Sequence, residues 1–172
     1  IKAKAKTEII CDLLLKNKVS PKDLAASAEK LKDPAKATCI EALEFATKQK
    51  PAIIDKAGFR FVTASLTSKA PRVKWESAKV IGNTAHLFKE ELGEPIKKLL
   101  ANTEDEGTVV RWSAAFALGE IVKLKTRYNK TLVPAIEAIC NSEEKKQHQK
   151  RPPKTKWICL DSLMMRIATK MV

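Results

Sequence analysis

The sequence predicts an all-α protein built from repeated helical pairs, and three observations support this. Val73–Gly82 and Val110–Gly119 share Val, a basic residue, Trp, Ala and Gly at identical offsets, 37 residues apart. A fixed period of this length is typical of stacked supersecondary units. Of the 172 residues, 44% are apolar and only 5 are Gly, which favours helices over turns and disorder. The apolar residues never form the alternating runs typical of strands.

The first expected element is a helix at about residues 3–17, with apolar residues at helical spacing (Ile9, Ile10, Leu13, Leu14). Four helical pairs follow, and their expected ranges are 20–49, 51–90, 93–125 and 128–172, within a single domain of residues 1–172. The first helix of each pair is predicted to begin near a proline, because proline is tolerated in a first helical turn. These prolines are Pro21, Pro51, Pro95 and Pro134.

The second helices are predicted from the repeated motif and its weaker copies. Ala35–Glu44 lies 38 residues before the Val73 copy, and Thr155–Met164 restores the Lys-Trp pair 45 residues after the Val110 copy. The expected second helices cover residues 35–49, 71–90, 108–125 and 154–171. Their apolar stripes each need a neighbouring helix to cover them.

The segment Leu92–Leu100 followed by Val110–Gly119 resembles a HEAT repeat, with a proline-started first helix and a Val-Arg-x-x-Ala-x-x-Ala-Leu-Gly second helix. The resemblance extends over about residues 20–172. It implies a short α-α superhelix whose second helices line an inner, concave surface. It also implies that an acidic residue at the turn pairs with the second-helix arginine, here Asp105 with Arg111. The other units place Lys30, Ser68 and Lys150 at that acidic position.

The chain is strongly basic, with 33 Lys+Arg against 20 Asp+Glu and a formal net charge of +13. Residues 123–172 are especially basic, and residues 145–156 are expected to form an exposed basic loop that includes Lys150, Arg151 and Lys154. Such a balance suits an acidic protein or a nucleic acid, and a simply solvated lysine-rich surface is the alternative.

The candidate contact residues lie on the second helices. Each Trp directly follows a basic residue, in the pairs Lys74–Trp75, Arg111–Trp112 and Lys156–Trp157. With Lys79, Phe116 and Lys123 these residues could form a basic and aromatic ladder on the inner face. The alternative is that each Trp packs between adjacent repeats, and the exposure of the indoles distinguishes the two.

The cysteines and the lack of a long apolar run bear on location. Cys11, Cys39, Cys140 and Cys159 are far apart in apolar helical contexts, so buried thiols in a reducing, cytoplasmic compartment are expected. No apolar run approaches the roughly 20 residues of a membrane span.

No pattern of catalytic or metal-binding residues emerges. The sequence lacks G-x-S-x-G, P-loop, GxGxxG and HExxH motifs, and His86 and His148 have no partners at ligand spacing. We therefore expect no enzyme, cofactor or metal. A remote alternative is a HEAT-like DNA alkylation-repair glycosylase, because Trp157 and Asp161 are four residues apart on one predicted helix face.

The predicted function is a scaffold that presents a curved helical surface to another macromolecule. A protein or peptide with an acidic segment is the first candidate partner and a nucleic acid is the second. The resemblance in fold does not separate them. No oligomeric state is predicted.

Overall fold

A computed structural model describes residues 3–149, which contain eight α-helices and no strand. The predicted all-α composition is therefore confirmed for this part of the chain. The helices are α1 (Ala3–Leu15), α2 (Pro21–Glu29), α3 (Asp33–Gln49), α4 (Lys56–Ser65), α5 (Pro71–Thr84), α6 (Gly93–Asn102), α7 (Thr108–Lys123) and α8 (Asn129–Gln149). Three short 3-10 helices, η1 (Pro51–Ile53), η2 (Ala85–Leu87) and η3 (Lys89–Glu91), lie in the connections.

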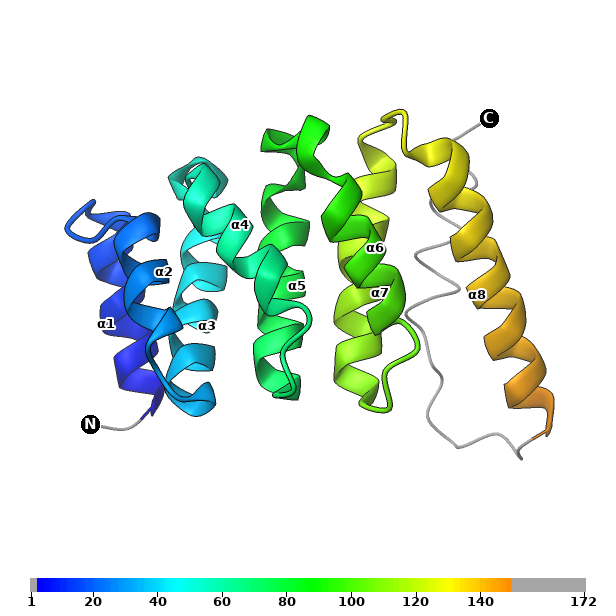
Figure 1. Cartoon of the computed structure of the whole chain (residues 1–172), viewed down its shortest axis with the longest axis horizontal. Helices are drawn as coiled ribbons and strands as arrows, with labels where there is room; N and C mark the ends of the chain where they lie inside the picture. The colour runs from blue at the N-terminus through cyan, green and yellow to red at the C-terminus, as the bar shows by residue number, and fades with distance from the viewer. Residues whose placement is uncertain (1–2, 150–172) are drawn as a thin grey trace.

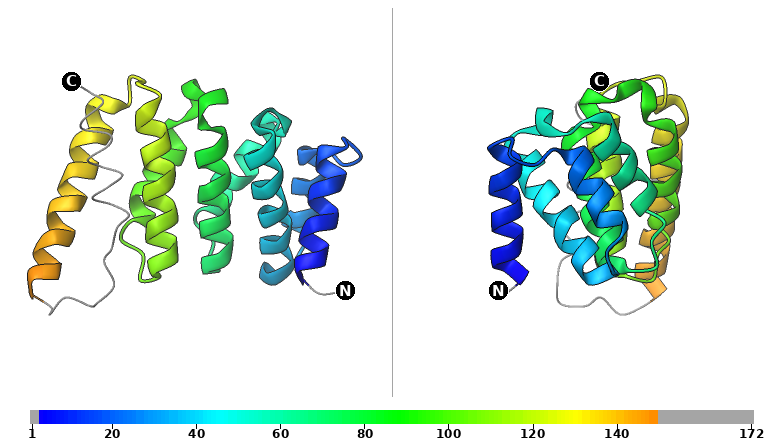
Figure 2. Two further views of the ribbon diagram at one scale, coloured as in Figure 1. Left: turned by 180° about the vertical axis from the view of Figure 1, so that it is seen from behind. Right: turned by 60° about the vertical axis from the view of Figure 1, so that its left-hand side comes forward.

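The helices form two layers (Figure 1). In one layer α1, α3, α5 and α7 stand side by side, each packed on its neighbour. In the other layer α2, α4 and α6 follow one another in front of that row, and α8 stands beside α7 at the far end. Figure 2 shows the row of α1, α3, α5 and α7 from behind. We call this row the second layer, because α3, α5 and α7 are the second helices of their pairs, and we call the layer of α2, α4, α6 and α8 the first layer.

The same positions are buried in successive second-layer helices. Val73, Ser77 and Ile81 of α5 are each no more than 1% exposed, as are their counterparts in α7, which are Val110, Ala114 and Leu118. In α3, at a separation of 38 residues, two of the three counterparts are buried, Cys39 and Leu43, whereas the first, Ala35, is exposed near the start of the helix. The weak copy at Ala35–Glu44 therefore has the predicted register at its second and third buried positions, and its first position does not enter the core.

Two helix starts in the first layer are set by polar caps. The Ser20 hydroxyl accepts from the backbone N–H of Asp23 at the start of α2. Asp55 accepts from the backbone N–H of Gly58 in α4 at 2.7 Å and from that of Lys22 in α2 at 3.1 Å. Because one carboxylate satisfies donors at both helix starts, Asp55 also links the two neighbouring helices.

Three predicted boundaries are wrong. Pro51 begins only the 3-10 helix η1. The α-helix starts five residues later, at the point where the Asp55 side chain caps its first turn. Pro134 lies inside α8, which begins at Asn129. The helix expected over residues 71–90 ends at Thr84, and η2 and η3 follow it.

Two other expectations concern the C-terminal part of the chain. The basic loop predicted at 145–156 is wrong for residues 145–149, which belong to α8. The rest of that loop and the helix predicted at 154–171 lie outside the described residues. None of the described helices combines the length and apolarity needed to cross a bilayer.

The connections before α5 and α7 use the same turn. Ser68 Oγ accepts from the backbone N–H of Ala70, and 37 residues later Asp105 Oδ1 accepts from that of Gly107 at 2.8 Å. The expected pairing of the Asp105 and Arg111 side chains is not formed. The Arg111 guanidinium donates to the carbonyl oxygens of Asp105 and Glu106, and the Asp105 carboxylate binds Lys74 of the preceding unit at 2.6 Å.

Candidate interaction surface

The repeat register places twelve residues in a regular array on α3, α5 and the segment that follows it, and α7. In each unit the residues are spaced by four, four and three positions, so they follow one face of a helix. We call this array the grid. Its members are Ala37, Glu41, Phe45 and Lys48 in α3, Trp75, Lys79, Asn83 and His86 in α5 and η2, and Trp112, Phe116, Glu120 and Lys123 in α7.

The first grid position becomes more exposed along the chain. Ala37 is buried, Trp75 is partly buried and Trp112 is 43% exposed. The Trp75 indole N–H donates to Glu76 Oε1 at 2.8 Å. The Trp112 ring stacks on Phe116, with ring centroids 6.2 Å apart. Trp112 is thus nearly half exposed and Trp75 is partly exposed, so neither indole is fully buried, which is consistent with the basic and aromatic ladder.

The second grid position contacts neighbouring second-layer helices: Glu41 reaches those on both sides, and Lys79 reaches the preceding one. Glu41 Oε2 accepts from Thr7 in α1 and from Arg72 in α5, both at 2.7 Å. Lys79 lies between two carboxylates, 3.1 Å from Glu76 and 3.5 Å from Glu44. The amino group of Lys79 is therefore already paired inside the protein.

Phe116 fills the same position in α7 and packs against Gly82 of α5. A Cβ atom on Gly82 would lie 2.6 Å from Cε1 of Phe116, a distance that real contacts do not reach. Gly82 is conformationally ordinary, so its role is to leave room for the aromatic ring.

Glu44 and Glu76 lie almost completely buried between α3 and α5. Their side chains are 5% and 6% exposed, and that of Lys79 is 27% exposed. Burial raises the pKa of Glu44, nearby Lys79 offsets part of this rise, and the negative charge of Glu76 adds to it. Sequence reasoning missed both carboxylates, although Glu44 stands at the position where the other two copies have glycine.

The last two grid positions combine an exposed ring with basic groups. Phe45 is 38% exposed, whereas Asn83 donates to Thr47 and to the carbonyl oxygen of Glu44. The fourth position of every unit is exposed, and it holds Lys48, His86 or Lys123. Lys123 pairs with Glu120 at 2.5 Å. Sequence reasoning missed Phe45, because the first position of its helix is alanine instead of tryptophan.

The grid contains most of the predicted contact residues that the structure describes, namely Trp75, Lys79, Trp112, Phe116 and Lys123. Arg111 lies outside it and holds the turn before α7. Lys150, Arg151, Lys154, Trp157 and Asp161 lie outside the described residues.

Other features of residues 3–149 offer little for chemistry. Among the side chains that the structure describes, no group of three or more His, Cys, Asp and Glu could hold a metal ion. A cleft of about 310 Å³ between α4 and α6 is open, and its charged residues Lys98 and Arg60 are near Glu94 and Glu91. Cys11 and Cys39 are buried free thiols, as predicted, and burial raises the pKa of both.

The chain matches no protein-family model, no curated protein and no solved structure.

Proposed function

We propose that the chain is a HEAT-like α-α superhelix that acts as a non-enzymatic binding module. Its grid binds a protein or peptide with an acidic segment. The supporting architecture is the row of second-layer helices with the same register of buried positions, which holds grid residues on rigid elements instead of loops.

The observation that carries this proposal is the exposed Trp112, which stacks on Phe116 on α7 of the second layer. Folding alone favours burying a large aromatic side chain, and exposed rings on a rigid surface are typical of interaction hot spots. Phe116 fixes the indole from one side, so little side-chain entropy remains to be lost on binding.

The charges near these rings favour a partner with both apolar and acidic residues. Lys79 is neutralised by buried carboxylates, whereas Lys48 and Lys123 at the helix ends are exposed cations. Lys123 also pairs with Glu120 on the same surface, so a partner's carboxylate would share this lysine with Glu120. Trp112 and Lys123 are 11 residues apart, which corresponds to roughly 16 Å along a helix. An extended peptide covers this distance with about five residues. We therefore expect an apolar anchor about five residues from a carboxylate.

The test is selection of binders to the full chain from a random peptide display library, followed by affinity measurement with the enriched peptides. Trp112→Ala should weaken binding at least tenfold, because it removes the apolar anchor. Leu31→Ala is the matched control, since Leu31 is also 43% exposed but lies in the turn between α2 and α3. Enriched peptides that lack the apolar and acidic pair, or that bind Trp112→Ala unchanged, contradict the proposal.

A further inference from the structure

A second surface, distinct from most of the grid, lies at one edge of the molecule. Here the second-layer helices end and the first-layer helices begin, at residues 16–22, 48–56, 86–94 and 123–130 (Figure 1). We call this the lysine edge. Its exposed lysines that form no ion pair with any side chain that the structure describes are Lys18, Lys22, Lys48, Lys50, Lys89, Lys125 and Lys130.

The acidic residues on or beside this edge all have partners within the described chain. Asp23 and Asp55 take part in the caps of α2 and α4. Glu91 pairs with Lys56 at 2.8 Å, and Glu90 lies 3.7 Å from Arg127. The other ion pairs on or beside this edge join Asp12 to Lys16, Glu94 to Lys98 and Glu120 to Lys123. Asp23 and Asp55 form no ion pair with the side chains that the structure describes, but seven unpaired lysines outnumber these two carboxylates, so the charge left over on this edge is positive.

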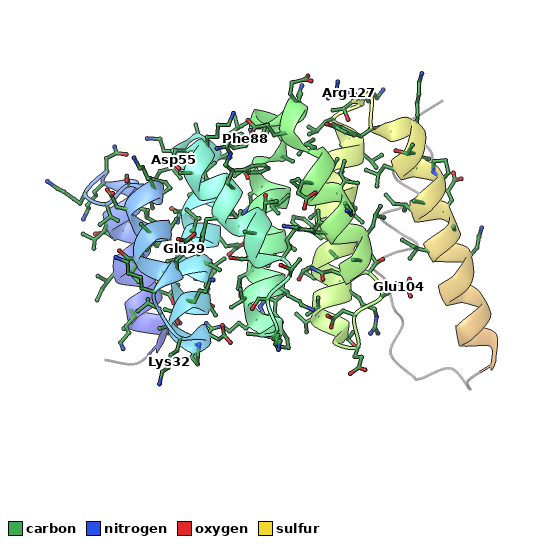
Figure 3. All side chains as sticks on the ribbon, viewed as in Figure 1. Glu29, Lys32, Asp55, Phe88, Glu104 and Arg127 are labelled. Atoms are coloured by element: carbon green, nitrogen blue, oxygen red, sulfur yellow. The ribbon has the colours of Figure 1, made fainter. Side chains whose placement is uncertain are left out.

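The opposite edge does not show this imbalance. It is formed by the turns at residues 29–36, 67–74 and 102–111, and Figure 3 labels Lys32 and Glu104 there and Arg127 at the lysine edge. Its exposed side chains without an ion pair in residues 3–149 include both signs: Glu29, Asp33, Glu104 and Glu106 beside Lys30, Lys32 and Lys69. A uniform excess of lysine for solubility does not explain a difference between two edges of one array.

We propose that the lysine edge binds the phosphodiester backbone of a nucleic-acid duplex. This inference goes beyond the proposed function and does not depend on it. Each of the four turns contributes at least one unpaired lysine, and neighbouring helices in a layer stand on the order of 10 Å apart. The edge thus extends over roughly 30 Å, about nine base pairs of duplex.

The chemistry of the edge favours a phosphate backbone over an acidic protein. A tight protein interface needs apolar anchors, and Leu87 is the one large apolar side chain of this edge that is exposed among residues 3–149. Backbone binding needs only cations that displace condensed counterions, and flexible lysines supply these without fixed geometry.

The experiment measures anisotropy of a fluorescent 20-base-pair DNA duplex with the full chain over a range of salt concentrations, with an RNA duplex as a second probe. The edge variant Lys18→Gln/Lys50→Gln/Lys89→Gln/Lys125→Asn changes one lysine in each turn. Asn suits position 125, where φ is +51°. The control variant Lys4→Gln/Lys30→Gln/Lys32→Gln/Lys69→Gln removes the same charge from the opposite edge and the start of α1.

The edge variant should bind at least tenfold more weakly at about 0.1 M salt, with a salt-dependence slope smaller by about 2–4, because each lost phosphate contact reduces the slope by about 0.9. The control variant should retain binding within about threefold. The DNA and RNA duplexes should show similar affinities and similar salt-dependence slopes, because both present a phosphodiester backbone.

Three results would overturn the proposal. They are absence of duplex binding at about 50 mM salt, equal losses in the two variants, and competition by polyglutamate that equals competition by unlabelled duplex. Trp112→Ala should leave duplex binding unchanged, so failure of the grid and failure of the edge are separable. A loss with Trp112→Ala would move nucleic-acid binding to the grid and would also contradict the inference.

Discussion

The α3–α5 and α5–α7 contacts use the same repeat positions and fill them with opposite chemistry. Between α3 and α5, Lys79 faces Glu44. Between α5 and α7, the corresponding residues are Phe116 and Gly82, and the ring packs where a side chain is absent. Both helix pairs are closely packed, so one repeat geometry accommodates a buried ion pair and an apolar contact.

The difference shows that the α3–α5 contact depends on the pairing of charges, whereas the α5–α7 contact depends on room for an aromatic ring. A buried ion pair offsets the cost of desolvation only while both partners remain, so the α3–α5 contact is vulnerable to loss of either one. The Phe116–Gly82 contact between α5 and α7 contains no charged side chain, and it is vulnerable to added volume. Exchanging residues between the two contacts tests this contrast directly.

The largest effect is expected from Gly82→Glu, which places the α3 residue in the α5–α7 contact. The new Cβ would be 2.6 Å from Phe116 and 3.4 Å from the Ala117 backbone, and the carboxylate would be buried without a cation. We expect a loss of about 4 kcal/mol in the free energy of unfolding, measured by urea denaturation. Gly93→Glu is the control, since Gly93 is exposed and begins α6, and it should change stability by less than about 1 kcal/mol. Equal losses in the two variants would contradict a space-limited contact.

The next effect is expected from Lys79→Phe, which places the α7 residue in the α3–α5 contact. It leaves Glu44 buried against an aromatic ring and deprives Glu76 of its cation, so we expect a loss of about 3 kcal/mol. Adding Glu44→Gly removes the unpaired carboxylate and makes room for the ring. The double variant should be at least about 2 kcal/mol more stable than the sum of the single changes, measured as a double-mutant cycle. Additive changes would show that the two positions are independent.

A smaller effect concerns pH and the same carboxylate. Burial raises the pKa of Glu44 in the folded state, so the folded protein binds its proton more tightly than the unfolded chain does. The resulting contribution to the free energy of unfolding is fully present below the unfolded pKa, and it is lost as the pH rises through the folded pKa. Glu44→Gln removes this dependence. The stability of the variant relative to the original chain should therefore be higher at pH 7 than at pH 4, measured by urea denaturation at both. Glu104→Gln, an exposed residue without an ion pair in the described chain, should show a much smaller change. If the difference in free energy of unfolding between Glu44→Gln and the original chain does not change with pH, the prediction is wrong.

The sequence predicted most of the described helices because the repeated motif fixes their register. Trp112 and Phe116 could be placed on one stripe by their spacing alone, and the structure brings them into a stack. The contact between Lys79 and Glu44 could not be predicted in this way, because it depends on how neighbouring helices are aligned. The helix starts near Pro51 and Pro134 were misplaced because proline permits a first turn and does not require one.

The smallest effects concern the equivalent turns before α5 and α7. Ser68→Ala removes one hydrogen bond to the backbone and should cost about 0.5 kcal/mol. Asp105→Ala removes the same bond and also the ion pair with Lys74, whose side chain is 20% exposed, so it should cost about 1.5 kcal/mol. In a Lys74→Ala background the loss from Asp105→Ala should fall to about that of Ser68→Ala, measured by thermal denaturation. If it does not fall, the turn itself and not the link between units accounts for the role of Asp105.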